Sequence, residues 1–251
     1  MIDRPHPEAL PHGKLREIFP DVFMITGSMK MQGRPITFSR NMIVVRENGV
    51  LTLFNTVRLD ELGLQQLDEL GEVKNVVRLA GYHGSDDPFY KERYSATVYA
   101  IKGQPYVSGF DLKAEPYLEA DEWLTHGDDL PVTGARLHVL PSCKPPEAVV
   151  VLLRHGGTLI SGDALQNWGS ADIFFSWFAK VMMRFGGFIK PTQVGPGWLK
   201  FARPSSQDLR SLLELRFDNV LPAHGDPVIG GAYDAYRPSI ERAASAREQG
   251  K

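Results

Sequence analysis

The sequence predicts a single α/β domain that contains two β-sheets. Short runs of β-branched and apolar residues, which are typical of strands, occur in both halves of the 251-residue chain and alternate with segments of helical periodicity. No linker-like stretch separates the halves, and a chain of this length can bury one large core. We therefore expect residues 1–251 to form one domain, with an irregular N-terminal arm over residues 1–20 and a helical insert over residues 172–189.

The N-terminal half is predicted to consist mainly of strands. Within the second apolar run, "ENG" at residues 47–49 has the composition of a hairpin turn. Leucines that share one helical face, and a proline at a first-turn position, predict two helices between the strands. In chain order we expect strands within 22–27 and 36–57, a helix over 59–71, a strand over 73–79, a helix over 88–94 and a strand over 96–101.

The C-terminal half is predicted to begin with strands and to end with helices. The turn "HGG" at residues 155–157 joins two apolar runs as a hairpin. A serine at position 205 or 206 is a suitable N-cap, and Pro238 is expected to interrupt the last helix. The expected elements are strands over 135–141, 147–154 and 158–161, helices within 172–189 and 205–217, a short strand from 219, and a helix over 230–249.

The overall composition argues against several classes of function. The formal net charge is −2, so the chain has no general attraction for nucleic acid. Cys143 is the single cysteine, which excludes an intrachain disulfide and suits a reducing compartment. The first 21 residues contain no apolar core flanked by basic residues, so we expect no signal peptide and a cytoplasmic location.

Four predicted strands are each followed by residues that can ligate a metal ion. Sheets fix the base of the loops that follow their strands, so strand ends are common places for functional side chains. Imidazole, carboxylate and thiolate groups together suit zinc or another first-row divalent ion. The candidates are His83, Asp86 and Asp87 after the strand at 73–79, Cys143 after 135–141, Asp163 after 158–161, and His224 after the strand that starts at 219.

In this order and context the sequence resembles the metallo-β-lactamase superfamily. "LISGDAL" and "VLPAHGDPV" match that family's later aspartate and histidine motifs, "VLPSCKPPEAVVVL" matches its middle motif in shape, and "YHGSDDPF" matches its HxHxDH loop in phase. "RNMIVVR", "LDEL" and "QNW…FF…AKVMMR" are similar to a divergent branch of the superfamily with a modified first loop. The resemblance covers nearly the whole chain and implies a four-layer αββα sandwich.

The first motif departs from the family pattern. Ser85 and Pro88 stand where two histidines belong, and Cys143 stands at the place of the middle histidine. By resemblance, one metal position retains Asp87, Asp163 and His224, while the other retains His83, Asp163 and, if its thiol points inward, Cys143. The resemblance thus implies a depleted, degenerate site that holds one zinc ion, or two if Cys143 points inward, with iron or manganese as alternatives.

The resemblance implies a metal-dependent hydrolase that acts on a small molecule of unknown class. A bound ion would lower the pKa of its water and polarise a carbonyl or phosphoryl oxygen. Asp87 or Asp86 is then expected to orient that water or accept its proton. Each candidate also has a structural explanation: loop hydrogen bonding for His83 and His224, capping for Asp163 and for the Asp-Asp-Pro run, and packing for Cys143.

The apolar segment 172–189 supports three alternatives. Lys180 and Arg184 interrupt it, so it is not predicted to span a membrane. The preferred interpretation is a helix buried in the core or in a homodimer interface. The second is a lid over the site, and the third, which two cations support only thinly, is docking on a membrane surface. In the lid, the residues that line an apolar substrate pocket would be Phe174, Phe175, Trp177 and Phe178.

The second overall hypothesis is a relative with no catalytic activity. It would keep the same sandwich without a metal, and it would bind a small apolar ligand, a partner or a membrane surface through the 172–189 helix. Metal content separates the two hypotheses, since a catalytic site of this kind requires an ion.

Overall fold

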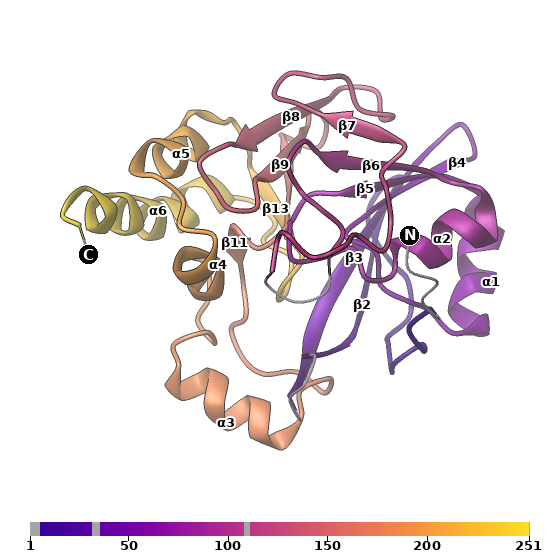
Figure 1. The fold of residues 1–251 in the computed structure, drawn as a ribbon, viewed down its shortest axis with the longest axis horizontal. Coiled ribbons are helices and arrows are strands. Elements are labelled where there is room, and N and C mark those ends of the chain that lie inside the picture. The colour runs from indigo at the N-terminus through magenta and orange to yellow at the C-terminus, as the bar shows by residue number, and fades with distance from the viewer. Residues whose placement is uncertain (1–5, 32–35, 108–110, 251) are drawn as a thin grey trace.

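Two β-sheets face each other in the computed structural model, which describes residues 6–31, 36–107 and 111–250 (Figure 1). The first sheet has the order β1-β2-β3-β4-β5-β6-β7, and the second has the order β13-β10-β9-β8. The strands of the first sheet are β1 (Arg16–Phe19), β2 (Val22–Lys30), β3 (Thr37–Glu47), β4 (Val50–Phe54), β5 (Glu72–Arg78), β6 (Thr97–Ile101) and β7 (Glu122–Leu124). Those of the second are β8 (Ala135–Leu140), β9 (Glu147–Leu152), β10 (Thr158–Ser161) and β13 (Asn219–Pro222), and a separate ribbon pairs β11 (Leu165–Gln166) with β12 (Gln193–Val194).

The first sheet is antiparallel at one edge and parallel at the other. Strands β1 to β4 pair antiparallel, whereas β4 to β7 pair parallel. The β3–β4 hairpin closes through Asn48 and Gly49, whose φ angles of 50° and 79° are those of a tight type I′ turn. The predicted turn at residues 47–49 is therefore confirmed.

The second sheet aligns the ends of two strands that carry candidate ligands. Strand β9 pairs antiparallel with β8 and β10, while β10 pairs parallel with β13. Since the carboxyl ends of parallel neighbours meet at one edge, the residues that follow β10 and β13 begin side by side. A bridge between Asn167 and Gly225 continues this contact beyond the strands.

Helices cover the outer faces of both sheets. Helices α1 (Glu61–Leu70) and α2 (Asp87–Tyr94) lie on the first sheet, and α4 (Pro196–Phe201), α5 (Ser206–Ser211), η1 (Leu212–Glu214) and α6 (Ala232–Glu248) lie on the second (Figure 1). Helix α3 (Trp177–Phe185) extends away from the sandwich. Separate apolar clusters fill the space under each helical layer and between the sheets, as a four-layer αββα sandwich requires. The predicted fold class is confirmed.

Three expected details differ from the structure. The predicted irregular arm ends earlier, because Arg16–Phe19 pairs with β2; residues 1–5 of that arm lie outside the described residues. Within 172–189 the helix covers Trp177–Phe185 and starts at the Ser176 cap. Helix α6 continues through Pro238, because Tyr236 and Ile240 pack into the core and hold the helix on both sides of the proline. No helix in the described part of the chain is long and apolar enough to cross a membrane.

Candidate metal centre

Three loops bring His83, Asp163 and His224 together. These loops follow β5, β10 and β13, so each ligand candidate is anchored by the end of a buried strand. One ligand atom from each residue lies within 4.8 Å of the other two. Nε2 of His83 lies 3.1 Å from Oδ1 of Asp163, and Nε2 of His224 lies 3.0 Å from the same oxygen. The arrangement therefore places one carboxylate oxygen between two imidazoles.

The Asp163 carboxylate stays ionised in this setting. Burial by itself raises the pKa of this carboxyl, but the neighbouring imidazoles of His83 and His224 outweigh burial and lower its pKa below the ordinary value. The side chain keeps 16% of its surface exposed, so the group is partly open to solvent. An ionised, partly accessible carboxylate is the form that ligates a cation.

The His224 ring is fixed in an orientation that directs one ring nitrogen toward Asp163. Its Nδ1 lies 3.1 Å from the carbonyl oxygen of Ser39, which accepts hydrogen bonds only, so Nδ1 carries the proton. In the neutral ring, Nε2 then presents a lone pair to the Asp163 oxygen. That contact is favourable when Nε2 carries a second proton or when both atoms coordinate the same metal ion. The Trp168 ring, with its centroid 4.8 Å from that of His224, holds the imidazole from the side.

His83 is buried and held in its neutral form. Burial lowers the pKa of this imidazole, and this effect outweighs the opposing attraction of Asp163. Its Nδ1 is buried and finds no hydrogen-bond partner among the described residues. Neutral imidazole is the protonation state that binds a metal. The three residues thus fit a divalent ion held by two nitrogens and one oxygen, with remaining positions open.

Comparisons with solved structures give a consistent result. The chain is similar to DIM-1 metallo-β-lactamase exposed to ceftazidime, with 17% identity and a TM-score of 0.61 over 94% of this chain and 100% of that one. It is similar to the mono-zinc form of metallo-β-lactamase FIM-1 from Pseudomonas aeruginosa, with 14% identity and a TM-score of 0.63 over 95% and 98% of the two chains. A metallo-β-lactamase from Hirschia baltica gives 13% identity and a TM-score of 0.61 over 94% and 97%.

The chain has the metallo-β-lactamase fold. The resemblance noted in the sequence is therefore confirmed at the level of fold, over nearly the whole chain. No protein-family model matches the sequence, and comparison with curated proteins gives no match either.

Asp86, the first acidic residue of the modified loop, is paired with an arginine. Arg40 Nη2 donates to Asp86 Oδ2, and both side chains are almost completely buried. The backbone amide of Arg58 donates to the same oxygen at 2.7 Å, and the Ser85 hydroxyl donates to Oδ1 at 3.4 Å. Asp86 is not part of the three-residue group, and its oxygens are already occupied by donors from the protein.

Asp87, the expected ligand and catalytic base, likewise lies outside the group. Thr56 Oγ1 donates to Asp87 Oδ1, and Tyr106 Oη donates to Oδ2 at 2.7 Å. Burial raises the pKa of Asp87 despite these hydrogen bonds. As the first residue of α2, followed by Pro88, it matches the helix-start interpretation of the Asp-Asp-Pro run. The structure does not bring it together with His83, Asp163 and His224.

Cys143 packs among apolar residues beneath the helices of the second sheet. It is 1% exposed, and its Sγ lies 4.0 Å from Oδ2 of Asp208. Burial raises the pKa of the thiol well above its ordinary value, whereas metal binding requires the thiolate. Cys143 is not in the three-residue group, and its surroundings match the packing interpretation.

Two buried ionisable residues near the site were missed in the sequence. Glu147 lies next to Asp163: its Oε1 accepts the backbone N–H of Ala164 at 2.7 Å, and burial, followed by repulsion from Asp163, raises its pKa well above the ordinary value. Arg40 is buried in β3, where its chain neighbours are the polar Ser39 and Asn41. The available sequence signal was a charged residue within a predicted strand, which predicts a buried partner without identifying it.

The four predicted pocket aromatics have different surroundings in the structure. Phe175 is buried against Trp168, with ring centroids 5.4 Å apart, and Phe174 is partly buried. Trp177 and Phe178 are 77% and 48% exposed, so their rings face solvent. Of the preferred expectation, burial in the core is wrong for this outward face, whereas burial in a homodimer interface stays a prediction.

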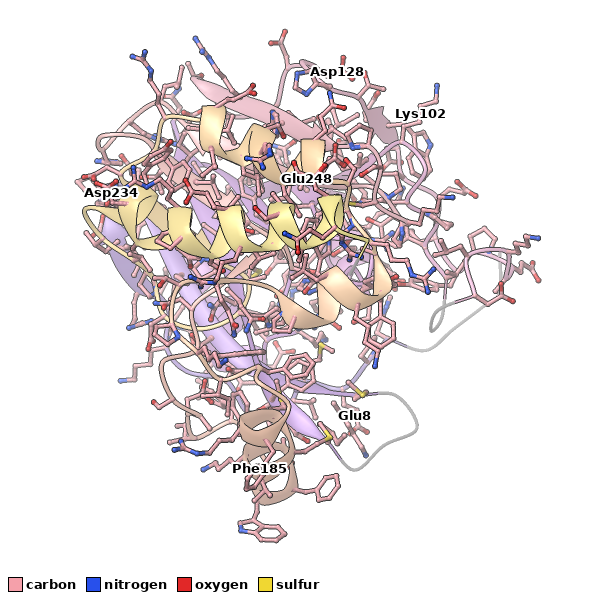
Figure 2. The ribbon with its side chains drawn as sticks, turned by 90° about the vertical axis from the view of Figure 1, so that its left-hand side faces the viewer. Glu8, Lys102, Asp128, Phe185, Asp234 and Glu248 are labelled. Atoms are coloured by element: carbon pink, nitrogen blue, oxygen red, sulfur yellow. The ribbon has the colours of Figure 1, made fainter. Side chains whose placement is uncertain are left out.

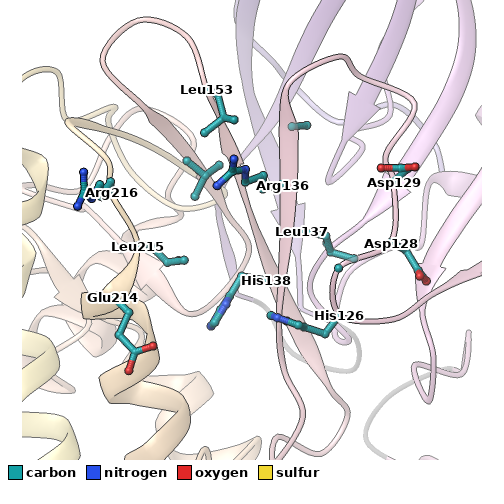
Figure 3. A pocket seen from close by; sticks show the side chains of 13 residues that line it. His126, Asp128, Asp129, Arg136, Leu137, His138, Leu153, Glu214, Leu215 and Arg216 are labelled. Carbon is teal, nitrogen blue, oxygen red and sulfur yellow. The ribbon is translucent and has the colours of Figure 1, made fainter.

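A surface pocket lies elsewhere, between β8 and the segment 214–216. Figure 3 shows His126, His138, Arg136 and Glu214 around it. The His138 imidazole shares a hydrogen bond of 2.8 Å with the Ser211 hydroxyl. None of the three grouped residues lines this pocket, so it is separate from the candidate metal centre.

Proposed function

We propose that this protein is a metal-dependent hydrolase whose site holds one divalent ion through His83, Asp163 and His224. The observation that carries the proposal is the His224 ring, whose Nδ1 is committed to a carbonyl while Nε2 faces a carboxylate oxygen at 3.0 Å. Two imidazoles and one carboxylate form a ligand set found in open catalytic zinc sites, and we propose zinc as the ion, with iron or manganese as alternatives.

A bound ion would supply Lewis acidity toward a carbonyl or phosphoryl oxygen and would activate water at neutral pH. The protein's own groups hold the site in place. Ser39 fixes the orientation of His224 through its carbonyl oxygen, and the Trp168 indole donates to the Ser39 hydroxyl at 3.1 Å. Glu147 holds the loop that carries Asp163 through the amide of Ala164. Such supporting contacts determine how well ligands are oriented.

The proposed stoichiometry is one ion per chain. A second ion would need further ligands from the same loop, but Asp86 pairs with Arg40, and Asp87 accepts from Thr56 and Tyr106. Cys143 is buried as a neutral thiol. The proposed ligand set therefore leaves out Asp86, Asp87 and Cys143, and we propose no catalytic role for the two aspartates.

The decisive experiment is elemental analysis of the untagged protein purified without added metal. We expect close to one zinc, iron or manganese ion per chain, and loss of that ion in Asp163→Ala and His224→Ala. His138→Ala is the matched control, since this histidine is outside the group and should leave the metal content unchanged. A metal-free protein whose thermal stability does not respond to zinc would contradict the proposal.

A hydrolase assay then tests the reaction class. The substrate class is best approached with a panel of small esters, thioesters, lactams and phosphodiesters, because one fold supports many reactions. We expect a hydrolysis rate that a chelator removes and that one equivalent of zinc restores. Activity that persists in Asp163→Ala at full chelation would show that the reaction does not use this site.

A further inference from the structure

Helix α3 presents an apolar face to solvent. Ile173 and Phe185 are 86% and 88% exposed, and Trp177 is 77% exposed. Trp177, Val181 and Phe185 are spaced by four residues, so they form one stripe along the helix, with Phe178 beside it. Figure 2 shows Phe185 at the extremity of the molecule, on the part that extends furthest from the sandwich.

The opposite face of α3 is anchored to the body of the protein. Ala179 and Met183 are buried in a cluster with Phe38, Trp168 and Phe175. The Ser176 hydroxyl accepts the backbone N–H of Ala179, and the Ser176 amide donates to the Thr37 carbonyl at 2.9 Å. The helix is therefore capped and held in this orientation, and the exposed stripe does not result from a loosely placed segment.

The charged residues of α3 and of the segment that follows it have one sign, although Asp172 precedes the exposed Ile173. Residues 173–207 contain no aspartate or glutamate, while the chain as a whole carries a net charge of −2. The five cations of this segment are all exposed, and they are Lys180, Arg184, Lys190, Lys200 and Arg203. Lys180 and Arg184 lie on α3 itself, so the helix that carries the apolar stripe is cationic on a chain with a negative net charge.

We propose that α3 docks on an anionic lipid bilayer surface. Exposed tryptophan and phenylalanine next to lysine and arginine form the composition of a helix that lies in the membrane interface. The aromatic rings would enter the boundary between headgroups and acyl chains, and Lys180 and Arg184 would lie at headgroup level. This revises the sequence expectation, in which two cations gave little support for membrane docking.

The same charges disfavour a second copy of the chain as the occupant. A symmetric dimer through α3 would bring two segments of like charge against each other. A partner surface that carries negative charge would attract this segment instead of repelling it. The anionic headgroups of a lipid bilayer form such a surface. The cations near the bilayer each add to binding, and this contribution decreases with added salt.

The test is sedimentation of the full chain with vesicles of phosphatidylglycerol and phosphatidylcholine, compared with vesicles of phosphatidylcholine alone. We expect binding to the anionic vesicles that weakens at high salt. Trp177→Ser/Phe185→Ser and Lys180→Glu/Arg184→Glu should each lower the apparent affinity by at least about tenfold. Leu62→Ser, which changes a leucine exposed on α1, is the matched control and should bind as the unaltered protein does.

Circular dichroism of each variant shows that the fold is retained, since the substituted side chains are exposed. Docking is contradicted if the unaltered chain stays in the supernatant, binds both vesicle types equally, or keeps its affinity in Trp177→Ser/Phe185→Ser. A dimer in light scattering that this double variant converts to a monomer, without vesicle binding, would assign the stripe to a second copy instead. None of the substituted residues belongs to the group of His83, Asp163 and His224, so the metal content should stay the same in these variants. The outcome is therefore independent of the proposed hydrolase site.

Discussion

The metal group is His83, Asp163 and His224, and the structural group is Asp86 and Asp87 with their hydrogen-bond partners. The two groups lie in the same part of the molecule, but their carboxylates have different neighbours. Asp163 faces the Nε2 atoms of His83 and His224. Asp86 and Asp87, only three and four residues after His83, face Arg40, Thr56 and Tyr106. Imidazole nitrogens can exchange a proton for a metal ion, whereas a guanidinium or a donating hydroxyl occupies the carboxylate lone pairs that a metal ion would need. The neighbours of a carboxylate, and not its place in a motif, therefore distinguish a metal site from a structural network.

The largest expected effect is a loss of stability when Asp86 loses the buried guanidinium of Arg40. Arg40→Met leaves Asp86 buried and without its ion-pair partner, which should lower the free energy of unfolding by about 3–5 kcal/mol. Denaturant unfolding measures the change. The double variant Arg40→Met/Asp86→Leu should recover part of this loss, but not all, because the Arg58 amide loses its acceptor. A single variant as stable as the original protein would show that the pair is not structural.

The next effect concerns the metal group. Asp163→Asn removes the charge that lies between the two imidazoles, and zinc affinity should fall by at least about 100-fold, beyond the loss that supporting residues usually cause. Calorimetric titration of the metal-free protein gives this value. Asp87→Asn is the matched control, and it should retain zinc affinity within a few-fold. Equal losses of zinc affinity in Asp163→Asn and Asp87→Asn would show that the two carboxylates do not differ in metal binding.

A smaller effect is expected for the stability of Asp87→Asn itself. An amide has one acceptor oxygen, so Thr56 and Tyr106 cannot both keep their hydrogen bonds, and the free energy of unfolding should fall by about 1–3 kcal/mol. Thermal unfolding with a chelator present separates this loss from metal binding. Stability equal to that of the unaltered chain would indicate that both hydroxyls find other acceptors.

The smallest effect is a pH dependence from Glu147. Its pKa is raised in the folded protein, so folding binds a proton and the associated stability is lost as pH rises above the ordinary value of 4.5. Glu147→Gln keeps an acceptor for the Ala164 amide and removes the ionisation. In the metal-free state the variant should gain stability relative to the original protein at pH 8, and the gain should disappear near pH 4. A gain that is constant with pH would contradict this assignment.

Much of the fold and part of the site follow from the sequence. Strand ends predicted from apolar runs placed His83, Asp163 and His224 in loops, and the parallel pairing of β10 with β13 brings two of them together. The predicted boundaries of α1 and α2 agree closely with the structure, because Asp60 caps α1 and Pro88 lies in the first turn of α2. These are local features, and local features can be read from neighbouring residues.

The rest depends on distant contacts. Motif phase assigned Asp87 to the metal site, but Thr56 and Tyr106, which are 31 and 19 residues away, determine where its carboxylate points. The exposed face of α3 could not be predicted, because an apolar helix suits a core, an interface or a membrane surface equally well from periodicity alone. The partners of Arg40 and Glu147 are 46 and 17 residues away along the chain, so the sequence does not identify them.

The carboxylates of Asp86 and Asp87 are already hydrogen-bonded to other side chains, and this limits how the loop can be re-engineered. Replacing Ser85 and Pro88 with histidines would rebuild the letters of an HxHxDH motif, yet Asp87 would remain tied to Thr56 and Tyr106, and Arg40 would keep its positive charge beside the loop. A dinuclear design would have to change residues on β3, before α1 and after β6 as well. The orientation of the side chains in this loop thus depends on contacts with three distant segments. Substitutions within the HxHxDH motif alone would not restore a second metal position.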